Sequence, residues 1–166
     1  MAKRNDLIKV PMTIEWPGKQ NRKYFLKHLI ESSGYTTMAE IGVRDGRTTF
    51  FLLDNIPDLT IYAVDLSIKG FYNKEVSKKY ADRLVPIEGN SYLVANNVPN
   101  VDLVFIDADH GYEGCSKDIK QYMSKVNPGG IFSGHDIDYP GVNKAVNEAL
   151  DRYEVGPNNV WYKVIF

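Results

Sequence analysis

Apolar residues along the chain fall into short segments whose spacing alternates between that of strands and that of helices. Runs such as LTIYAVDL and VDLVFID are continuous and rich in β-branched residues, which is typical of strands buried on both faces. Other segments repeat apolar residues every three or four positions, which is typical of amphipathic helices, as at Val142, Ala145, Val146, Ala149 and Leu150. The pattern predicts strands over residues 36–43, 59–66, 83–89, 101–107, 129–136 and 159–166, and helices over residues 19–34, 46–56, 71–81, 91–97, 112–126 and 142–150.

Strands and helices that alternate in this way form crossover units and a mainly parallel sheet. Because such crossovers are right-handed, helices cover both faces of the sheet. The pattern therefore predicts an α/β fold, a Rossmann-like three-layer α/β/α sandwich. We expect one domain over residues 1–166, with an irregular N-terminal arm at 1–18 and the core at 19–166. The solvated face of the first helix is expected to carry Lys19, Arg22, Lys23 and Lys27.

The composition fits an ordinary globular protein and excludes a general affinity for nucleic acid or anionic membranes. Of the 166 residues, 43% are hydrophobic and 25% are charged, and the net charge is -1. The single cysteine, Cys115, leaves no internal disulfide and suits a reducing compartment. No run approaches the roughly 20 apolar residues that a membrane span needs. We therefore expect a cytoplasmic protein.

Small and polar residues follow the first three predicted strands, at the strand ends where ligands bind in sheets of this kind. Gly42 and Gly46 bracket the loop after the first strand, where they let a ligand approach the backbone or simply make a tight turn. Asp65 follows the second strand; there a carboxylate accepts both hydroxyls of a ribose, or it is a solvated or capping residue. Asn90 and Ser91 follow the third strand and can hydrogen-bond an adenine edge, although Ser91 also suits a helix N-cap. Each position alone leaves both interpretations open.

The next two strands end in a denser group of polar residues. Asp107, Asp109 and His110 follow the fourth strand, and His135 and Asp136 follow the fifth. Neighbouring strands lie about 4.8 Å apart, so Asp107 and Asp136 can face one ion or one hydroxyl. Three aspartates and two histidines that converge from adjacent strands favour a functional site over chance.

Two longer segments resemble a known family. AEIGVRDG is similar to the first motif of class I S-adenosylmethionine-dependent methyltransferases, an acidic residue followed by Gly-x-x-x-Gly. VDLVFIDADHGYEGCSKDIKQYMSKVNPGGIFSGHD resembles a subgroup of small methyltransferases, methyltransferase domain family 24. That subgroup joins an Ile-Asp-x-x-His-x-Tyr strand end to a Pro-Gly-Gly turn and a Gly-His-Asp strand end. The resemblance covers residues 36 to 147 in the right order, and it implies a fold that ends in a short antiparallel strand or hairpin.

The resemblance also implies roles for single residues in binding S-adenosylmethionine. Glu40 would hold the methionine amino end, Asp65 the ribose hydroxyls, and Asn90 and Ser91 would lie near the adenine. The full set implied to bind this cofactor is Glu40, Gly42, Gly46, Asp65, Asn90, Ser91 and Asp107.

Related O-methyltransferases that use a divalent ion, magnesium or manganese, bind it after strands four and five, which here implies Asp107, His135 and Asp136. His135 departs from the usual acidic pair, and an imidazole ligand favours manganese, iron or zinc over magnesium. A base must also remove the proton of the acceptor hydroxyl. Asp109 and His110 are the candidates beside Asp107, and histidine titrates near neutral pH. The expected activity is O-methylation of a small molecule or sugar.

The acceptor pocket is expected to need a cover. The N-terminal arm with Met12 and Trp16, followed by Tyr24, can supply it, or a second subunit can. The terminal segment VWYKVIF is apolar and could pair between subunits, which suggests a homo-oligomer.

Two other functions compete with this interpretation. The glycine loop and Asp65 also suit a nicotinamide-dependent oxidoreductase, but GVRDG lacks the middle glycine of Gly-x-Gly-x-x-Gly. That function also leaves the cluster from Asp107 to His110 unexplained. A non-catalytic module that binds S-adenosylmethionine would keep the cofactor pocket and transfer no methyl group.

Overall fold

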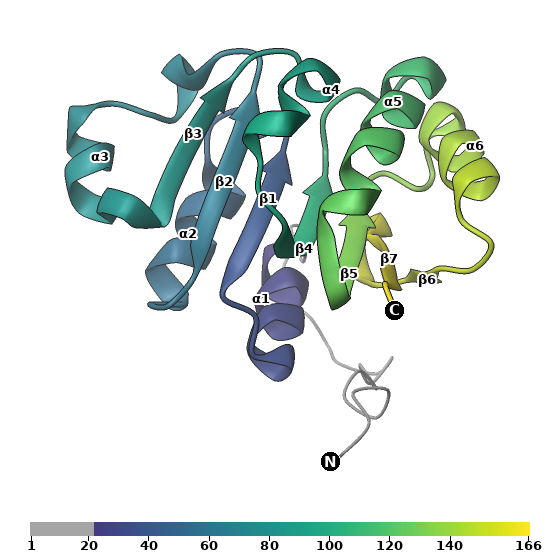
Figure 1. Ribbon diagram of the computed structural model, residues 1–166, viewed down its shortest axis with the longest axis horizontal. Helices are drawn as coiled ribbons and strands as arrows, with labels where there is room; N and C mark the ends of the chain where they lie inside the picture. The colour runs from purple at the N-terminus through teal and green to yellow at the C-terminus, as the bar shows by residue number, and fades with distance from the viewer. Residues whose placement is uncertain (1–21) are drawn as a thin grey trace.

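The computed structural model describes residues 22–166, which form a seven-stranded sheet with helices on both faces (Figure 1). The strands are β1 (Thr37–Ile41), β2 (Thr60–Asp65), β3 (Leu84–Glu88), β4 (Val101–Ile106), β5 (Val126–Gly134), β6 (Glu154–Val155) and β7 (Trp161–Val164). The α-helices are α1 (Arg22–Ser33), α2 (Arg47–Asn55), α3 (Lys74–Tyr80), α4 (Ser91–Val94), α5 (Tyr112–Tyr122) and α6 (Pro140–Ala149).

The strand order is β3-β2-β1-β4-β5-β7-β6, and β1 to β5 are parallel. The two short C-terminal strands are antiparallel, β7 to β5 and β6 to β7. The predicted Rossmann-like α/β fold with a mostly parallel sheet and an antiparallel C-terminal end is confirmed. The order reverses at β1, whose neighbours are β2 and β4, and the parallel strands all end at one edge (Figure 1). This is the place where ligands bind in open α/β sheets.

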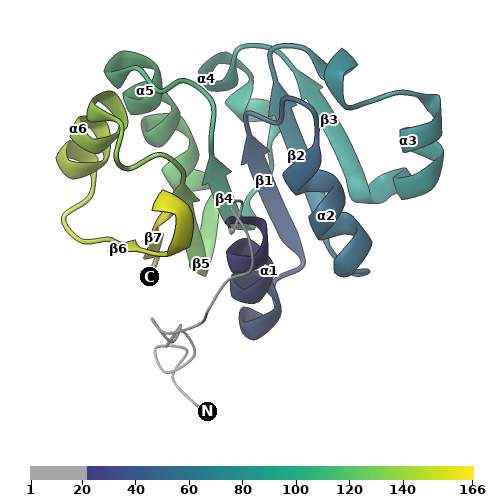
Figure 2. The ribbon, with the colours of Figure 1, turned by 180° about the vertical axis from the view of Figure 1, so that it is seen from behind.

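Two hydrophobic cores lie on opposite faces of the sheet. One contains α1, α2 and α3 and is built around side chains such as Phe25, Leu52 and Tyr80. The other contains α5 and α6, with Tyr122 and Trp161 completely buried (Figures 1 and 2). The strands therefore bury both faces, which explains their continuous apolar runs.

The element boundaries differ from the sequence prediction near Val126. The helix predicted over residues 112–126 ends at Tyr122, a 3-10 turn covers Met123–Lys125, and Val126 begins β5. Val126 pairs with Val101 of β4, and Pro128 follows, which disfavours helix. Helical spacing alone does not reveal this, because a buried strand residue and a buried helix residue are equally apolar.

The predicted arm at residues 1–18, with Met12 and Trp16, lies outside the described residues, as does Lys19. Within residues 22–166, no helix has both the length and the apolar character needed to cross a membrane.

Candidate active site

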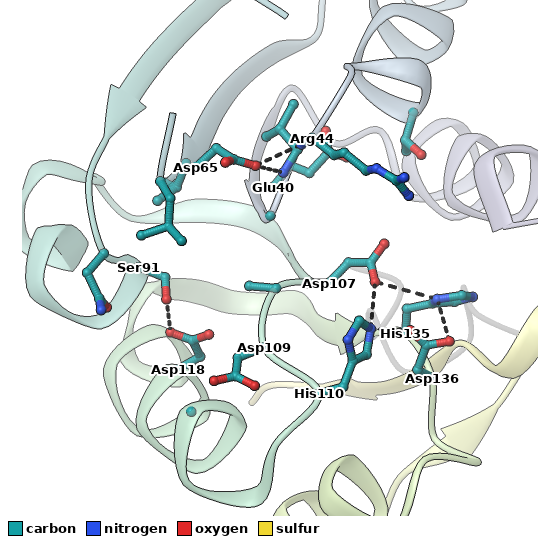
Figure 3. A pocket seen from close by; sticks show the side chains of 18 of the residues that line it. Glu40, Arg44, Asp65, Ser91, Asp107, Asp109, His110, Asp118, His135 and Asp136 are labelled. Atoms are coloured by element: carbon teal, nitrogen blue, oxygen red, sulfur yellow. Dashed lines mark hydrogen bonds and ion pairs between the residues drawn. The ribbon is translucent and has the colours of Figure 1, made fainter. Parts of the chain in front are cut away.

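A cavity of about 840 Å³ opens at the carboxyl edge of the parallel strands. This volume lies within the range of about 300–1,000 Å³ that is typical of small-molecule sites. Of the candidate residues, those that line the cavity are Glu40, Gly42, Asp65, Asn90, Ser91, Asp107, Asp109, His110, His135 and Asp136. Gly46 is the one candidate that does not line it. The strand ends that the sequence singled out therefore do meet in one place (Figure 3).

The two glycines after β1 have steric reasons to be glycine. Gly42 has φ +89°, and a Cβ there would overlap the backbone carbonyl of Asp107. Gly46 has φ +77° at the N-cap of α2, and a Cβ there would overlap the Phe50 ring. Gly42 thus brings the ends of β1 and β4 together at the wall of the cavity, whereas Gly46 shapes the turn into α2.

Asp65, at the end of β2, is tied to the glycine loop. Its Oδ2 accepts hydrogen bonds from the backbone N–H of Val43 (2.8 Å) and Arg44 (2.7 Å), and its Oδ1 accepts one from Ser67 N–H (3.2 Å). These contacts fix the carboxylate at the cavity wall (Figure 3). A carboxylate has about four lone-pair positions, so Asp65 keeps acceptor capacity for a ligand hydroxyl.

Glu40 is buried at the end of β1 and is only 3% exposed. Burial raises the pKa of Glu40 to about 8. The hydrogen bond from Thr49 Oγ1 lowers this pKa, and the negative charge of Asp107 raises it. Thr49, on α2, is itself buried and is not among the residues that line the cavity. A cationic group placed beside Glu40 would favour its ionised form.

Three candidate ligands and bases meet at the other end of the cavity. His110 Nε2 lies 2.6 Å from Asp136 Oδ2 and 3.9 Å from Asp107 Oδ1. One ligand atom from each of Asp107, His110 and Asp136 lies within 4.8 Å of the others. The ring of Tyr139 is 5.0 Å from that of His110 and is half exposed. This cluster can hold a cation or move a proton.

Arg22 is a site residue that the sequence analysis missed. It was expected on the solvated face of the first helix, but its Nη1 lies 3.0 Å from Asp107 Oδ2 and 3.2 Å from His135 Nδ1. That expectation is wrong for Arg22, because α1 approaches the ends of β4 and β5. Burial alone would lower the pKa of His135, but the ion pairs with Asp107 and Asp136 outweigh it and raise that pKa.

Asp109 has a local partner of its own. Its Oδ1 accepts a hydrogen bond from the backbone N–H of Gly111 (2.7 Å), directly before α5. A Cβ at Gly114 would overlap the Asp109 carboxylate, so this side chain lies against the first turn of α5. It lies apart from the cluster of Asp107, His110 and Asp136 (Figure 3). The contacts of Asp109 are therefore local to the turn before α5, whereas His110 contacts Asp136 within the cluster.

A buried carboxylate, Asp118, is the second site residue that was missed. It lies on α5, is 0% exposed, and borders the cavity. Its Oδ1 accepts the hydroxyl hydrogen of Ser91 at 2.5 Å. Burial raises the pKa of Asp118 to about 6, while the Ser91 hydrogen bond lowers it and the Asp109 charge raises it. The signal was an aspartate among the apolar positions Cys115 and Ile119 of a helix.

Residues 39–137, more than half of the chain, match the family described as methyltransferase domain. The chain belongs to this methyltransferase domain family, as its motifs indicated. A search of curated proteins found no match.

Solved structures with the same fold are class I methyltransferases. A Staphylococcus aureus protein provisionally described as a caffeoyl-CoA O-methyltransferase aligns with a TM-score of 0.75 at 15% identity, covering 90% of this chain and 85% of that one. CalS11, a TDP-rhamnose 3'-O-methyltransferase of calicheamicin biosynthesis, aligns with a TM-score of 0.61 at 21% identity. The alignment covers 78% of this chain and 71% of CalS11. MycE, from mycinamycin biosynthesis and solved with Mg, S-adenosylhomocysteine and mycinamycin VI, aligns with a TM-score of 0.62 at 16% identity. The alignment covers 92% of this chain and half of MycE. At these identities the likeness shows the fold.

Proposed function

We propose that this protein transfers a methyl group from S-adenosylmethionine to a hydroxyl of a small molecule or sugar. The observation that carries the proposal is a single cavity that joins Asp65 at one strand end to the His110–Asp136 pair at another. Asp65 suits the binding of a ribose, and the His110–Asp136 pair suits an acceptor hydroxyl. Of two proteins with the same fold, CalS11 is a TDP-rhamnose 3'-O-methyltransferase and MycE was solved with mycinamycin VI, which supports a small-molecule or sugar acceptor.

The cofactor would lie along the cavity from Glu40 to Ser91. Glu40 would attract the methionine ammonium, Asp65 would accept the ribose hydroxyls, and Asn90 and Ser91 would lie against the adenine. Leu66 follows Asp65 and lines the cavity although it is 74% exposed, so a bound purine would cover an apolar side chain. The methyl group of a sulfonium is already activated, so these residues act mainly by alignment.

His110 is the proposed base. With Asp136 accepting the Nε2 hydrogen at 2.6 Å, the other ring nitrogen carries the lone pair that takes a proton. As the acceptor oxygen forms its bond to the methyl carbon, the carbon–sulfur bond breaks and the hydroxyl proton passes to His110. Asp136 would then stabilise the imidazolium, in the way that a buried aspartate does in a catalytic triad.

A divalent cation is the alternative means of activating the hydroxyl. Two carboxylates and one imidazole within 4.8 Å of one another fit such an ion, and the imidazole favours manganese over magnesium. Asp107, His110 and Asp136 would hold it, with His110 in the place of the His135 that the resemblance implies, and a bound ion would lower the pKa of the acceptor hydroxyl. Arg22 already offers a positive charge to Asp107, so an ion would have to compete with its guanidinium.

Thermal unfolding with S-adenosylhomocysteine or NAD tests the cofactor. A ligand that binds only the folded protein raises the melting temperature, so S-adenosylhomocysteine should raise it and NAD should not. A shift with NAD alone would overturn the proposal. Transfer of radiolabelled methyl from S-adenosylmethionine into a panel of sugars and catechols then distinguishes an enzyme from a non-catalytic binding module.

The role of an ion is tested by titrating manganese into the wild-type protein and two variants. If an ion is used, Asp107→Ala should abolish manganese binding and excess chelator should abolish methyl transfer. Arg22→Gln should then tighten manganese binding, because the competing guanidinium is gone. Full methyl transfer in excess chelator would leave His110 as the means of activation.

A further inference from the structure

Two buried nitrogen atoms close to the His110–Asp136 pair have no hydrogen-bond partner among residues 22–166. They are Nε2 of His135 and Nε1 of Trp161. The His135 side chain is only 10% exposed, and Trp161 is completely buried. A polar group in the interior that makes no hydrogen bond costs free energy, because it has given up its contacts with bulk water. Each nitrogen therefore needs a partner inside the protein.

Gly134, at the end of β5, brings the two rings close together. It pairs with Trp161 of β7, and His135 follows it directly in the chain. A Cβ at Gly134 would lie 2.6 Å from Cε2 of Trp161, the ring carbon that is bonded to Nε1. Glycine at this position therefore lets the nitrogen edge of the indole approach the end of β5. Phe132, on the same strand, packs edge-on against the indole, with the ring centroids 5.4 Å apart.

A second, much smaller cavity is lined by both rings. Its volume is about 10 Å³, and Ile106, Cys115 and Val142 are among its other lining residues. A water molecule needs a cavity of roughly 10–15 Å³ and two or more polar partners. The cavity therefore has the size for one water molecule and for no larger ligand.

The hydrogen-bonding chemistry of the two nitrogens also suits water. The indole N–H of Trp161 can only donate. The other ring nitrogen of His135, Nδ1, lies 3.0 Å from Asp136 Oδ1 and 3.2 Å from Arg22 Nη1. When Nδ1 donates to Asp136, Nε2 of the neutral ring accepts, and when Nδ1 accepts from Arg22, Nε2 donates. Because water has two hydrogens and two lone pairs, it satisfies the indole together with either form of the imidazole.

We propose that one buried water molecule binds between Trp161 Nε1 and His135 Nε2 and holds the His135 ring against Asp107 and Asp136. Trp161 is then a positioning residue, which acts on the site through the water and His135. With Nδ1 at the carboxylates and Nε2 at the water, His135 has no nitrogen free for a metal ion. This agrees with the group of possible metal ligands, which contains His110 in its place. The inference goes beyond the proposed function, because it needs neither a cofactor nor an acceptor.

A high-resolution crystal structure of the ligand-free wild-type protein tests the water site. The expected result is an ordered water molecule within about 3.2 Å of both Trp161 Nε1 and His135 Nε2. The proposal is overturned if the density shows no water at this position, or a water that contacts only one of the two nitrogens. A direct hydrogen bond between the two rings would overturn it as well.

The positioning role of Trp161 is tested by nuclear magnetic resonance of the His135 ring nitrogens. Trp161→Phe removes the N–H but keeps an aromatic ring, so the Nε2 resonance should move because the water loses a partner. The control is Phe132→Leu, which removes a ring that packs against the indole but no hydrogen-bonding group, and which should leave that resonance in place. An unmoved resonance in Trp161→Phe, or an equal shift in both variants, would overturn the positioning role.

A second variant decides if Trp161→Phe does not fold. His135→Gln removes the imidazole from the other side of the water, so the indole N–H resonance of Trp161 should move. An unmoved indole resonance would overturn the link between the two rings. None of these measurements contains a cofactor or an acceptor, so their failure leaves the proposed function to its own tests.

Discussion

The two ends of the cavity are built differently, although the same parallel strands supply both. At the Ser91 end, the buried side chains of Asp118 and Tyr122 each make one hydrogen bond to Ser91. At the His110 end, charges share partners: Asp107 contacts Arg22, His110 and His135, and the His110 side chain is 44% exposed. A fixed set of contacts suits a constant ligand such as a cofactor. A set of shared contacts can rearrange around an acceptor or an ion.

The largest effect that would sharpen this comparison is expected at His110. Replacement of a base typically lowers the rate by about 10²–10⁴-fold, so His110→Ala should reduce methyl transfer by that factor. The affinity for S-adenosylhomocysteine should change less than about twofold, because His110 lies at the acceptor end. Radiolabelled methyl transfer and calorimetry check the two parts. A large loss of cofactor affinity in His110→Ala would contradict the assignment of His110 to the acceptor end of the cavity.

Asp65 should show the opposite pattern. Hydrogen bonds to charged groups are worth about 1.5–3 kcal/mol, so Asp65→Ala should weaken S-adenosylhomocysteine by about 10- to 100-fold. The melting temperature should also fall, because the N–H groups of Val43 and Arg44 lose their acceptor. Asp65→Asn keeps one side-chain oxygen and is the matched control, with a smaller loss of both. An unchanged affinity of Asp65→Ala for S-adenosylhomocysteine would show that the ribose does not bind at Asp65.

Cofactor binding should release a proton from Glu40. Burial raises the pKa of Glu40 from 4.5 to about 8, so at pH 7 the ligand-free protein holds a proton there. The methionine ammonium favours the carboxylate, so binding should release up to one proton and tighten as pH rises towards 8, by at most about tenfold per pH unit. Calorimetry in buffers of different ionisation enthalpy measures this release. Glu40→Gln should abolish it, and an equal release from that variant would contradict the assignment.

The same group affects stability in the opposite direction. The pKa of Glu40 is higher in the folded than in the unfolded protein, so its contribution to stability is complete below pH 4.5 and is lost as pH rises through 8. Denaturant unfolding of the ligand-free protein between pH 6 and 9 should therefore show a decline that Glu40→Gln lacks. A decline of equal size in the variant would assign the effect to another group.

The smallest effect is expected at Asp109. Asparagine at this position keeps the oxygen that accepts from Gly111 N–H, so Asp109→Asn should change methyl transfer and melting temperature little, within about twofold in rate. The same assays used for His110→Ala check this. A loss approaching that of His110→Ala would make Asp109 the base and would move the catalytic group towards the cofactor end.

Local patterns predicted the fold and the edge where the site lies. Apolar runs such as β4 determine which residues are buried, and parallel strands bring their carboxyl ends to one edge. Asp107, His110 and Asp136 could therefore be expected to meet. The place of Arg22 in the site could not be predicted, because a basic residue on an amphipathic helix is expected to face solvent until the position of that helix is known. The helical pattern could mark Asp118 as a buried position between Cys115 and Ile119, but it could not identify its partner Ser91, which lies 27 residues away.

The most direct test of the central claim is a crystal structure of the wild-type protein with S-adenosylhomocysteine. The account predicts the adenine against Ser91, the ribose hydroxyls at Asp65, and the sulfur turned towards Asp107 and His110. A ligand bound in the reverse direction, or bound outside the cavity, would contradict it.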